Sequence, residues 1–210
     1  MITISRDMLH TKIFNDKQRE MEKLVQNFAG DYYLVGGTAL ALQLGHRRSV
    51  DFDLFTPNSF DNKKILAKVR RHYPITQIYV SQTDQLTIMT NEVKMTWYKY
   101  DFEIPLTVSW GKITMPDELT IAAMKAFAMG QRSKWKDYVD MYFLIRKYGL
   151  KKIVEHTDKL FGEGLFDEAL LRGQLAYHKD IDYREEVEFM PGFEVSKERV
   201  LAELLEVSIS

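Results

Sequence analysis

The sequence predicts an α+β fold, in which a mixed β-sheet flanked by helices is followed by an all-helical second half. Up to about residue 115, short β-rich runs alternate with segments of helical period. Beyond Pro116, the apolar residues recur at helical spacing. We therefore predict two regions, an α/β core over 1–115 and a helical region over 116–210 that packs on it.

The first half contains three predicted helices and five predicted strands. Asn15 or Asp16 is suited to cap the first helix, and Gly30 is suited to end it. Pro57 ends the second strand, because a proline cannot donate a hydrogen bond within a sheet. The predicted helices cover 15–29, 38–44 and 63–72, and the predicted strands cover 32–35, 50–55, 75–81, 85–90 and 93–99.

The second half is predicted to contain helices alone. Pro191-Gly192 marks a loop before the last of them. The five predicted helices cover 117–129, 135–147, 151–160, 165–177 and 197–207.

The composition excludes several kinds of site. The 210 residues carry a formal net charge of −1, so total charge gives no argument for nucleic acid or membrane binding. There is no cysteine, which excludes disulfides, thiol catalysis and cysteine-type zinc sites. The N-terminus carries no signal-like apolar run, and no apolar stretch approaches the roughly 20 residues that span a bilayer. We expect a cytoplasmic protein with no membrane partner.

Asp51 and Asp53 lie two residues apart on a predicted strand. Side chains alternate between the faces of a strand, so both carboxylates should point the same way. Their neighbours Val50, Phe52 and Leu54 should point the opposite way, into a core. Two adjacent carboxylates repel unless a cation lies between them, and Mg²⁺ binds one or two carboxylates together with substrate phosphates. The pair therefore predicts a metal site.

A Gly36-Gly37 pair follows one predicted strand and precedes a predicted helix. Glycine allows the backbone to approach a phosphate closely, and the first N–H groups of the helix would point at the anion. Thr38 adds a hydroxyl donor, and Arg47 could clamp phosphate oxygens. A lone glycine pair is most often a turn, and a lone Asp-x-Asp is most often a solvated strand edge. Their combination in this order favours a nucleotide site.

The segment over 32–55, YYLVGGTALALQLGHRRSVDFDLF, resembles the nucleotidyltransferases of the DNA polymerase β type. Its part GGTALALQLGHRRSVDFDLF is similar to the AbiEii/AbiGii toxin family of type IV toxin–antitoxin systems. The segment over 121–145, IAAMKAFAMGQRSKWKDYVDMYFLI, resembles that family's helical motif. The resemblance covers most of the chain and implies the nucleotidyltransferase fold.

The resemblance implies transfer of a nucleoside monophosphate from an NTP to an RNA, such as a tRNA, or to a protein. It implies Mg²⁺ or Mn²⁺ as cofactor, a cognate antitoxin as partner, and a role in abortive infection or phage defence. Asp140 fits the same helical pattern as Asp137 but could equally be structural. The positions that match the family are Asp51, Asp53, Lys125 and Asp137 for catalysis, with Asp51 and Asp53 on the metal, and Gly36, Gly37, Thr38, Arg47 and Ser49 for the nucleotide.

Lys94 is a further predicted nucleotide-binding residue, because of its position on its strand. Lys94 and Thr96 share a face, so a lysine beside the metal site would reach phosphate, whereas the alternative is a solvated strand lysine. A second basic group, formed by Lys125, Arg132, Lys134 and Lys136, could meet a triphosphate or an RNA backbone, or be an ordinary solvated surface.

Thr96 and Thr120 stand where many members of the family carry acids. A threonine cannot act as a base at neutral pH or supply a carboxylate's charge. Asp117 or Glu118, one turn from Thr120, is a candidate replacement. The alternative function is therefore a catalytically impaired nucleotide-binding or interaction protein. A kinase-like phosphoryl transferase is a third hypothesis. Its P-loop form is disfavoured, because the chain lacks the GxxxxGK[ST] motif.

Overall fold

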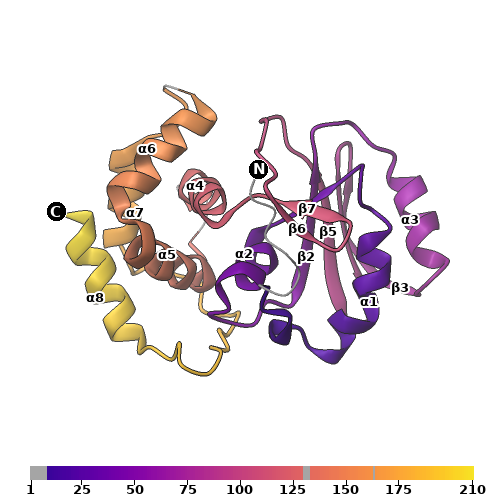
Figure 1. The fold of residues 1–210 in the computed structure, drawn as a ribbon, viewed down its shortest axis with the longest axis horizontal. Coiled ribbons are helices and arrows are strands. Elements are labelled where there is room, and N and C mark those ends of the chain that lie inside the picture. The colour runs from indigo at the N-terminus through magenta and orange to yellow at the C-terminus, as the bar shows by residue number, and fades with distance from the viewer. Residues whose placement is uncertain (1–8, 130–132, 163) are drawn as a thin grey trace. The chain divides into compact units, whose positions relative to one another are not determined.

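The computed structural model describes residues 9–129, 133–162 and 164–210. The chain divides into two compact units, Met1–Asp117 and Glu118–Ser210 (Figure 1). The first contains the strands and the second contains helices, so the α+β class is confirmed.

Unit 1 is built on a five-stranded mixed sheet in the order β1-β2-β5-β4-β3. The central pair β2 and β5 is parallel, and the other neighbours are antiparallel. The parallel pairing places Asp51 opposite Lys94 and Asp53 opposite Thr96. The strands are β1 (Tyr33–Val35), β2 (Asp51–Thr56), β3 (Ile75–Gln82), β4 (Gln85–Thr90) and β5 (Val93–Lys99).

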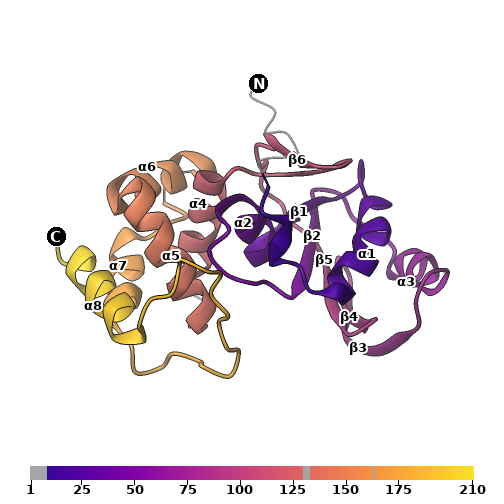
Figure 2. The same ribbon diagram turned by 60° about the horizontal axis from the view of Figure 1, so that its bottom comes forward.

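Helices cover both faces of this sheet. Figures 1 and 2 show α1 (Asp16–Gln26) and α3 (Asn62–Arg70) on one side and α2 (Gly36–Leu44) on the other. On the α1 side, alternate strand residues are fully buried, among them Phe52, Leu54 and Trp97. Phe28, just after α1, packs its ring 5.2 Å from that of Trp97. This apolar layer turns the intervening strand residues to the α2 side.

The first turn of α1 is fastened to the loop before β2. Asn15 caps the helix by accepting from the Gln18 backbone at 2.8 Å, and the Gln18 side chain accepts from the Asn15 backbone at 3.3 Å, which is a capping box. The fully buried Gln18 side chain also donates to the carbonyl of Ser49 at 2.6 Å. The cap therefore orders the helix and the segment that leads into the acidic strand.

A short hairpin completes unit 1, formed by β6 (Val108–Trp110) and β7 (Ile113–Met115), which the sequence reasoning missed. Trp110 is fully buried and stacks on Phe52 with ring centroids 6.2 Å apart. Gln26 holds the hairpin from α1, donating to the Trp110 carbonyl at 2.9 Å and accepting from Lys112 N at 2.6 Å. Three-residue strands are too short to show an alternation in sequence, so tertiary contacts decide them.

Unit 2 is helical throughout its regular structure. α4 packs against α5, α6 and α7, and α8 packs against α5 and α7. The stretch between α7 and α8 runs beside the start of α5, where Asp182 N donates to Ser133 at 2.7 Å and Trp135 N donates to Asp182 at 3.0 Å. The helices are α4 (Glu118–Met129), α5 (Trp135–Tyr148), α6 (Leu150–Phe161), α7 (Glu168–Ala176) and α8 (Lys197–Ser208).

Two predicted details are wrong. Val50 lies before β2 and is 55% exposed instead of pointing into the core, because the strand begins one residue later than predicted. α2 begins at Gly36 instead of Thr38, so both glycines form the first turn of the helix. Within the described ranges, no helix has the length and apolar character to cross a membrane.

Replacing Asn15 with alanine should lower the free energy of unfolding by about 1 kcal/mol, the usual cost of losing an N-cap side chain. Chemical denaturation of the two proteins would measure it. Arg19→Ala is the matched control, since Arg19 is exposed on the same helix and loses no cap. An equal loss in both variants would contradict the role given to the cap.

Glu185 gives unit 2 a dependence on pH. Partial burial raises the pKa of its carboxyl, but hydrogen bonds from Lys134 and Lys136 outweigh that effect and lower the pKa to about 2. Because the folded-state pKa is depressed, the stabilisation is present above the ordinary value near 4.5 and is lost as the pH falls toward about 2. Glu185→Gln should therefore lower Tm at neutral pH, and its difference from the wild type should shrink from about pH 4.5 downward.

The neighbouring exposed residue supplies the control for that measurement. Glu186→Gln should leave Tm close to the wild-type value at every pH, because Glu186 is exposed and outside the lysine pair. Thermal scans from pH 7 to pH 2 would decide, and a Glu185→Gln difference that stays constant with pH would refute the assignment.

Candidate functional site

The carboxylates of Asp51 and Asp53 lie on the face of β2 that turns away from the core. Phe52 and Leu54, between and beyond them, are fully buried, whereas both acids are partly accessible. The alternation follows from the pleat of the strand. The side chain of Asp51 is 14% exposed, low enough to strengthen its interaction with a cation and high enough to admit one.

Gly36 makes the close approach between α2 and the acidic strand. It adopts φ +70°, and a Cβ at this position would overlap Oδ2 of Asp53. A Cβ at Gly37 would lie 2.6 Å from Nη2 of Arg47 and 3.0 Å from Oγ of Ser49. A side chain at Gly36 would displace the Asp53 carboxylate and would also strain the backbone at positive φ, and a side chain at Gly37 would displace the Arg47 guanidinium.

The N-terminus of α2 opens beside these acids. Its N-cap is Val35, which has no side-chain oxygen to accept from the first turn. The first N–H groups of a helix lack partners within the helix and carry a partial positive charge. This end of α2 therefore has the chemistry of an anion site next to the carboxylate pair.

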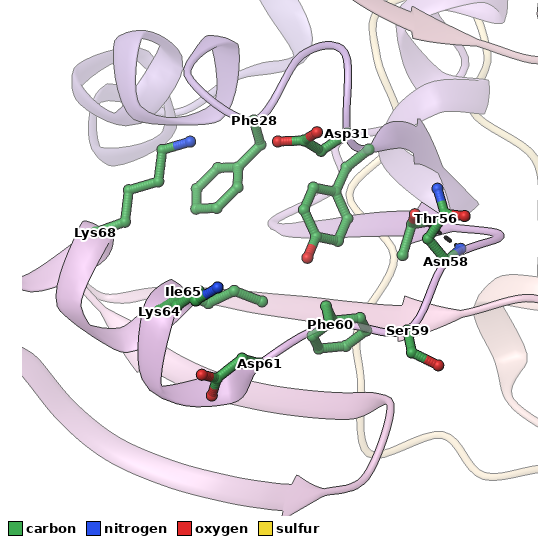
Figure 3. A pocket seen from close by; sticks show the side chains of 11 residues that line it. Phe28, Asp31, Thr56, Asn58, Ser59, Phe60, Asp61, Lys64, Ile65 and Lys68 are labelled. Atoms are coloured by element: carbon green, nitrogen blue, oxygen red, sulfur yellow. Dashed lines mark hydrogen bonds between the residues drawn. The ribbon is translucent and has the colours of Figure 1, made fainter.

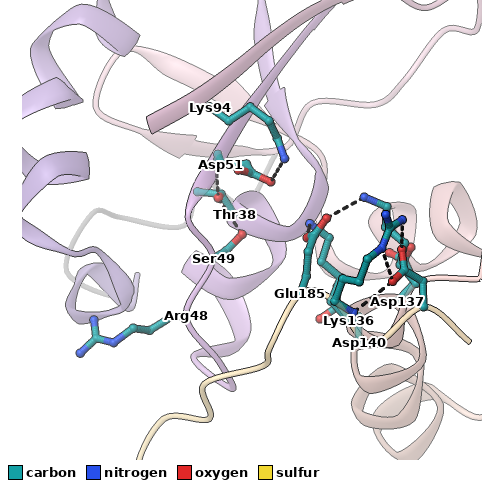
Figure 4. Close-up of polar contacts among 12 residues, drawn as sticks. Thr38, Arg48, Ser49, Asp51, Lys94, Lys136, Asp137, Asp140 and Glu185 are labelled. Atoms are coloured by element: carbon teal, nitrogen blue, oxygen red, sulfur yellow. Dashed lines mark hydrogen bonds and ion pairs between the residues drawn. The ribbon is translucent and has the colours of Figure 1, made fainter. Parts of the chain in front are cut away.

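Thr38 is a structural link rather than an open donor in this structure. Its hydroxyl donates to the backbone carbonyl of Asp51 and lies 2.9 Å from Oγ of Ser49 (Figure 4). Thr38 is 1% exposed and Ser49 is 8% exposed. The sequence predicted that the Thr38 hydroxyl would bind phosphate. In this structure, that hydroxyl links α2 to β2.

The two arginines before β2 support the turn from behind. Arg47 is 3% exposed, and its guanidinium lies against Gly37 and donates to the carbonyl of Arg48 at 2.8 Å. Arg48 donates to backbone carbonyls of the segment before α1, the nearest at 3.3 Å. A phosphate contact by Arg47 stays a prediction.

Lys94 meets the acids across the parallel pair of strands. Its ammonium lies 3.0 Å from Oδ2 of Asp51, and the lysine side chain is 32% exposed (Figure 4). Two residues further along β5, Thr96 stands directly opposite Asp53, and its hydroxyl lies 3.4 Å from that of Thr87. The ladder therefore carries a cation beside Asp51 and a neutral hydroxyl beside Asp53.

An aromatic row continues the same face beyond the acids. Phe55 lies two residues past Asp53, and its ring is 5.3 Å from Tyr98 and 5.4 Å from Tyr100. Tyr98 is 37% exposed. The pKa of Tyr100 is raised by burial and then by the neighbouring tyrosines, so this phenol stays neutral. The sequence analysis did not connect these residues to the acids. The two-residue spacing of Asp53 and Phe55, which places both on one face of the strand, could have shown the connection.

In unit 2, Lys125 on α4 is clamped between two carboxylates of α5. Its ammonium lies 2.8 Å from Oδ1 of Asp137 and 2.7 Å from Oδ2 of Asp140. All three side chains are at most 6% exposed. Asp137 and Asp140 are three residues apart and so share one face of α5. The two buried carboxylates share one ammonium at nearly equal distances, which makes Asp140 as much a part of this cluster as Asp137.

Thr120 and Glu118, in the first turn of α4, both have partners within unit 2. The Thr120 hydroxyl is 3.2 Å from Nε2 of His156 and the residue is 2% exposed. The Glu118 carboxylate pairs with Lys147 at 2.5 Å and accepts from the Tyr148 hydroxyl at 2.7 Å. Glu118 is therefore already committed to neighbours within unit 2.

The predicted basic group is partly neutralised. Lys134 lies 2.7 Å from Oε1 of Glu185, and Lys136 pairs with the other oxygen of the same carboxylate. Arg132 lies outside the described residues. In the part of the chain that the structure describes, no three acidic or histidine side chains gather as ligands for a metal.

The chain is similar to the uncharacterized protein aq_aa25 of Aquifex aeolicus (strain VF5), with 33% identity over 186 residues, 84% of this chain and 87% of that protein. The crystal structure of JHP933 from Helicobacter pylori is similar with a TM-score of 0.54 and 18% identity, over 96% of this chain and 92% of that chain.

A toxin has the same fold. MenT4, the nucleotidyltransferase toxin Rv2826c from Mycobacterium tuberculosis H37Rv, is similar with a TM-score of 0.51 and 15% identity, over 91% of this chain and 80% of that chain. At these identities the two structures establish the fold alone. The model of the family described as nucleotidyl transferase AbiEii toxin, type IV TA system, matches residues 21–85, which include the glycine turn and both acids. The chain belongs to the AbiEii family of nucleotidyl transferase toxins.

Proposed function

We propose that this protein transfers a nucleoside monophosphate from an NTP to an acceptor, with the α2 N-terminus and the acidic strand as the nucleotide site. One observation carries the proposal: Asp51 and Asp53 share a face directly against the Gly36-Gly37 turn. An anion-binding helix end beside two carboxylates suits a triphosphate that arrives with its cation.

The donor set fits a magnesium or manganese ion. Two carboxylates project from adjacent same-face positions, and substrate phosphates would complete an oxygen shell around a hard cation. Asp51 and Asp53 would hold the ion, which when bound neutralises charge on the attacking and leaving oxygens. Asp53 is oriented by its contact with Gly36, and Asp51 by the link from its carbonyl to Thr38.

Lys94 gives the site a charge balance before substrate arrives. Its ammonium offsets Asp51, so the two carboxylates do not repel without compensation. With a cation in place, the one-third-exposed lysine is free to turn to a phosphate oxygen beside it. The α2 N–H groups bind the triphosphate, and pyrophosphate leaves as the acceptor oxygen attacks the α-phosphorus.

Other assignments follow from family membership. Lys125 and Asp137 are proposed to act in catalysis, with Asp140 as the second carboxylate that holds the lysine in place. The proposed acceptor is an RNA, such as a tRNA, or a protein, and the proposed partner is a cognate antitoxin. The aromatic row of Phe55, Tyr98 and Tyr100 supports a substrate with a flat base on this face.

Asp53→Asn should lower nucleotide transfer by at least about 100-fold, because the neutral amide removes a charge that holds the cation. Asp51→Asn should behave in the same way. The measurement incubates the chain with cellular RNA, Mn²⁺ or Mg²⁺, and each NTP labelled in turn at the α- or the γ-phosphate.

The label position and a matched variant complete that experiment. Transfer of the α-label alone supports nucleotidyl transfer. Transfer of the γ-label would instead indicate a kinase-like reaction. Asp101→Asn is the control, because Asp101 is a 77% exposed acid of the same unit and forms its ion pair with Lys99. Absence of both label transfer and NTP binding would end the proposal.

The alternative function, a catalytically impaired nucleotide-binding or interaction protein, is favoured by one observation. Thr96 stands opposite Asp53, where a carboxylate would complete the ligand set. This alternative requires that the wild type binds NTP but transfers none.

Thr96→Asp tests the position of the metal independently of activity. A third carboxylate beside Asp53 should lower Tm without divalent cation, through charge repulsion, and should enlarge the rise in Tm on adding Mn²⁺. Thr96→Val is the control and should show no larger rise than the wild type. If Mn²⁺ raises the Tm of Thr96→Asp no more than that of the wild type, the proposed ion does not lie beside Asp53. If the wild type transfers no nucleotide but Thr96→Asp does, the impaired alternative is established.

A further inference from the structure

Unit 1 contains a cavity of about 320 Å³ away from the acidic pair (Figure 3). Thr56, the last residue of β2, lines it and points to the buried face of the strand, whereas Asp53 points to the other face. Three residues of strand separate these two positions by roughly 10 Å along the backbone. The cavity is therefore a separate site, bounded by the end of α1, the residue before β1 and the start of α3.

Aromatic rings form the apolar walls of the cavity. The Tyr32 ring meets Phe28 at 5.7 Å with an interplanar angle of 83°, and meets Phe60 at 5.8 Å with an angle of 70°. Ile65 adds an aliphatic wall and is 4% exposed. Edge-to-face walls of this kind favour a further ring over an alkyl chain.

Four charged side chains line the cavity, and two of them are already engaged. Asp61 caps α3 by accepting from Lys63 N at 2.8 Å. Lys68 donates to the carbonyl of Asn27 at 2.5 Å and lies 4.5 Å from the centre of the Phe28 ring.

One carboxylate and one ammonium remain for a ligand. Across the described ranges, the side chains of Asp31 and Lys64 make no hydrogen bond or ion pair. Figure 3 shows Asp31 above the cavity and Lys64 below it. Burial and then the charge of Asp31 raise the pKa of Tyr32, which also lines the cavity, to about 12, so its hydroxyl stays protonated as a donor.

We propose that this cavity binds a free aromatic α-amino acid. Its ring would lie among Phe28, Tyr32 and Phe60, its ammonium at Asp31 and its carboxylate at Lys64. The volume is at the lower end of ligand pockets, which suits one amino acid. A nucleotide fits poorly, since its several negative charges would face a single free lysine beside two carboxylates. The site lies apart from the proposed nucleotide site and does not depend on it.

The test is binding of L-phenylalanine, L-tyrosine and L-tryptophan to the full chain, by calorimetry and saturation-transfer NMR. A ligand of this size should bind with a Kd on the order of 1 mM. Phenethylamine, which lacks the carboxylate, and 3-phenylpropionate, which lacks the amine, separate the two charged contacts.

Each charged residue should affect one of the two analogues. Asp31→Asn should weaken L-phenylalanine and phenethylamine by about 2- to 5-fold and leave 3-phenylpropionate unchanged. Lys64→Gln should weaken L-phenylalanine and 3-phenylpropionate by a similar factor and leave phenethylamine unchanged. Phe60→Ala should weaken all three ligands by about tenfold or more. Lys63→Gln, at an exposed neighbour outside the lining, should change none of them.

Three results would overturn the proposal. They are absence of saturable binding by any of the three amino acids, binding of L-leucine as tight as that of L-phenylalanine, and equal effects of Asp31→Asn and Lys64→Gln on both analogues. Asp31 and Lys64 are exposed, so their variants retain the fold and decide the question even if Phe60→Ala unfolds.

Discussion

The contact between the Asp53 carboxylate and the backbone of Gly36 is the constraint on which the candidate site depends. It holds the first turn of α2 against the acidic strand at a distance that no side chain at Gly36 would permit. Thr38 closes the same junction from within by donating to the carbonyl of Asp51. An anion-binding helix end and a carboxylate pair thus occupy one place, although each alone is a common surface feature.

Lysine side chains lie against the carboxylates of both units, but in different surroundings. In unit 1, Lys94 reaches Asp51 across a pair of strands, and the lysine remains one-third exposed. In unit 2, Lys125 is buried between Asp137 and Asp140, where removing the lysine would deprive two buried carboxylates of the ammonium that they share. The first pair is partly open to solvent, whereas the buried cluster is closed to it. Loss of activity on changing Lys125 would therefore mix catalysis with stability, and the strand acids are the cleaner probes.

The two faces of β2 have different chemistry because of strand alternation. Asp51 and Asp53 face the α2 side, and Phe52, Leu54 and Thr56 face the side covered by α1 and α3. Where that helical layer ends, Phe60 and Tyr32 enclose the cavity at Thr56. A single strand therefore supports a polar site on one face and an aromatic cavity on the other.

The sequence by itself determined the α+β class, the eight α-helices and the five main-sheet strands of the described residues, and the family, because these depend on local periodicity and on motifs within a few residues. It also predicted that Phe52 and Leu54 would be buried between and beyond the acids. Only the tertiary structure decided that Thr38 faces the Asp51 carbonyl and that Lys94 faces Asp51. It also decided that the β6–β7 hairpin packs on Phe52. These contacts join residues far apart in the chain, and the register and packing that create them leave no trace in local spacing.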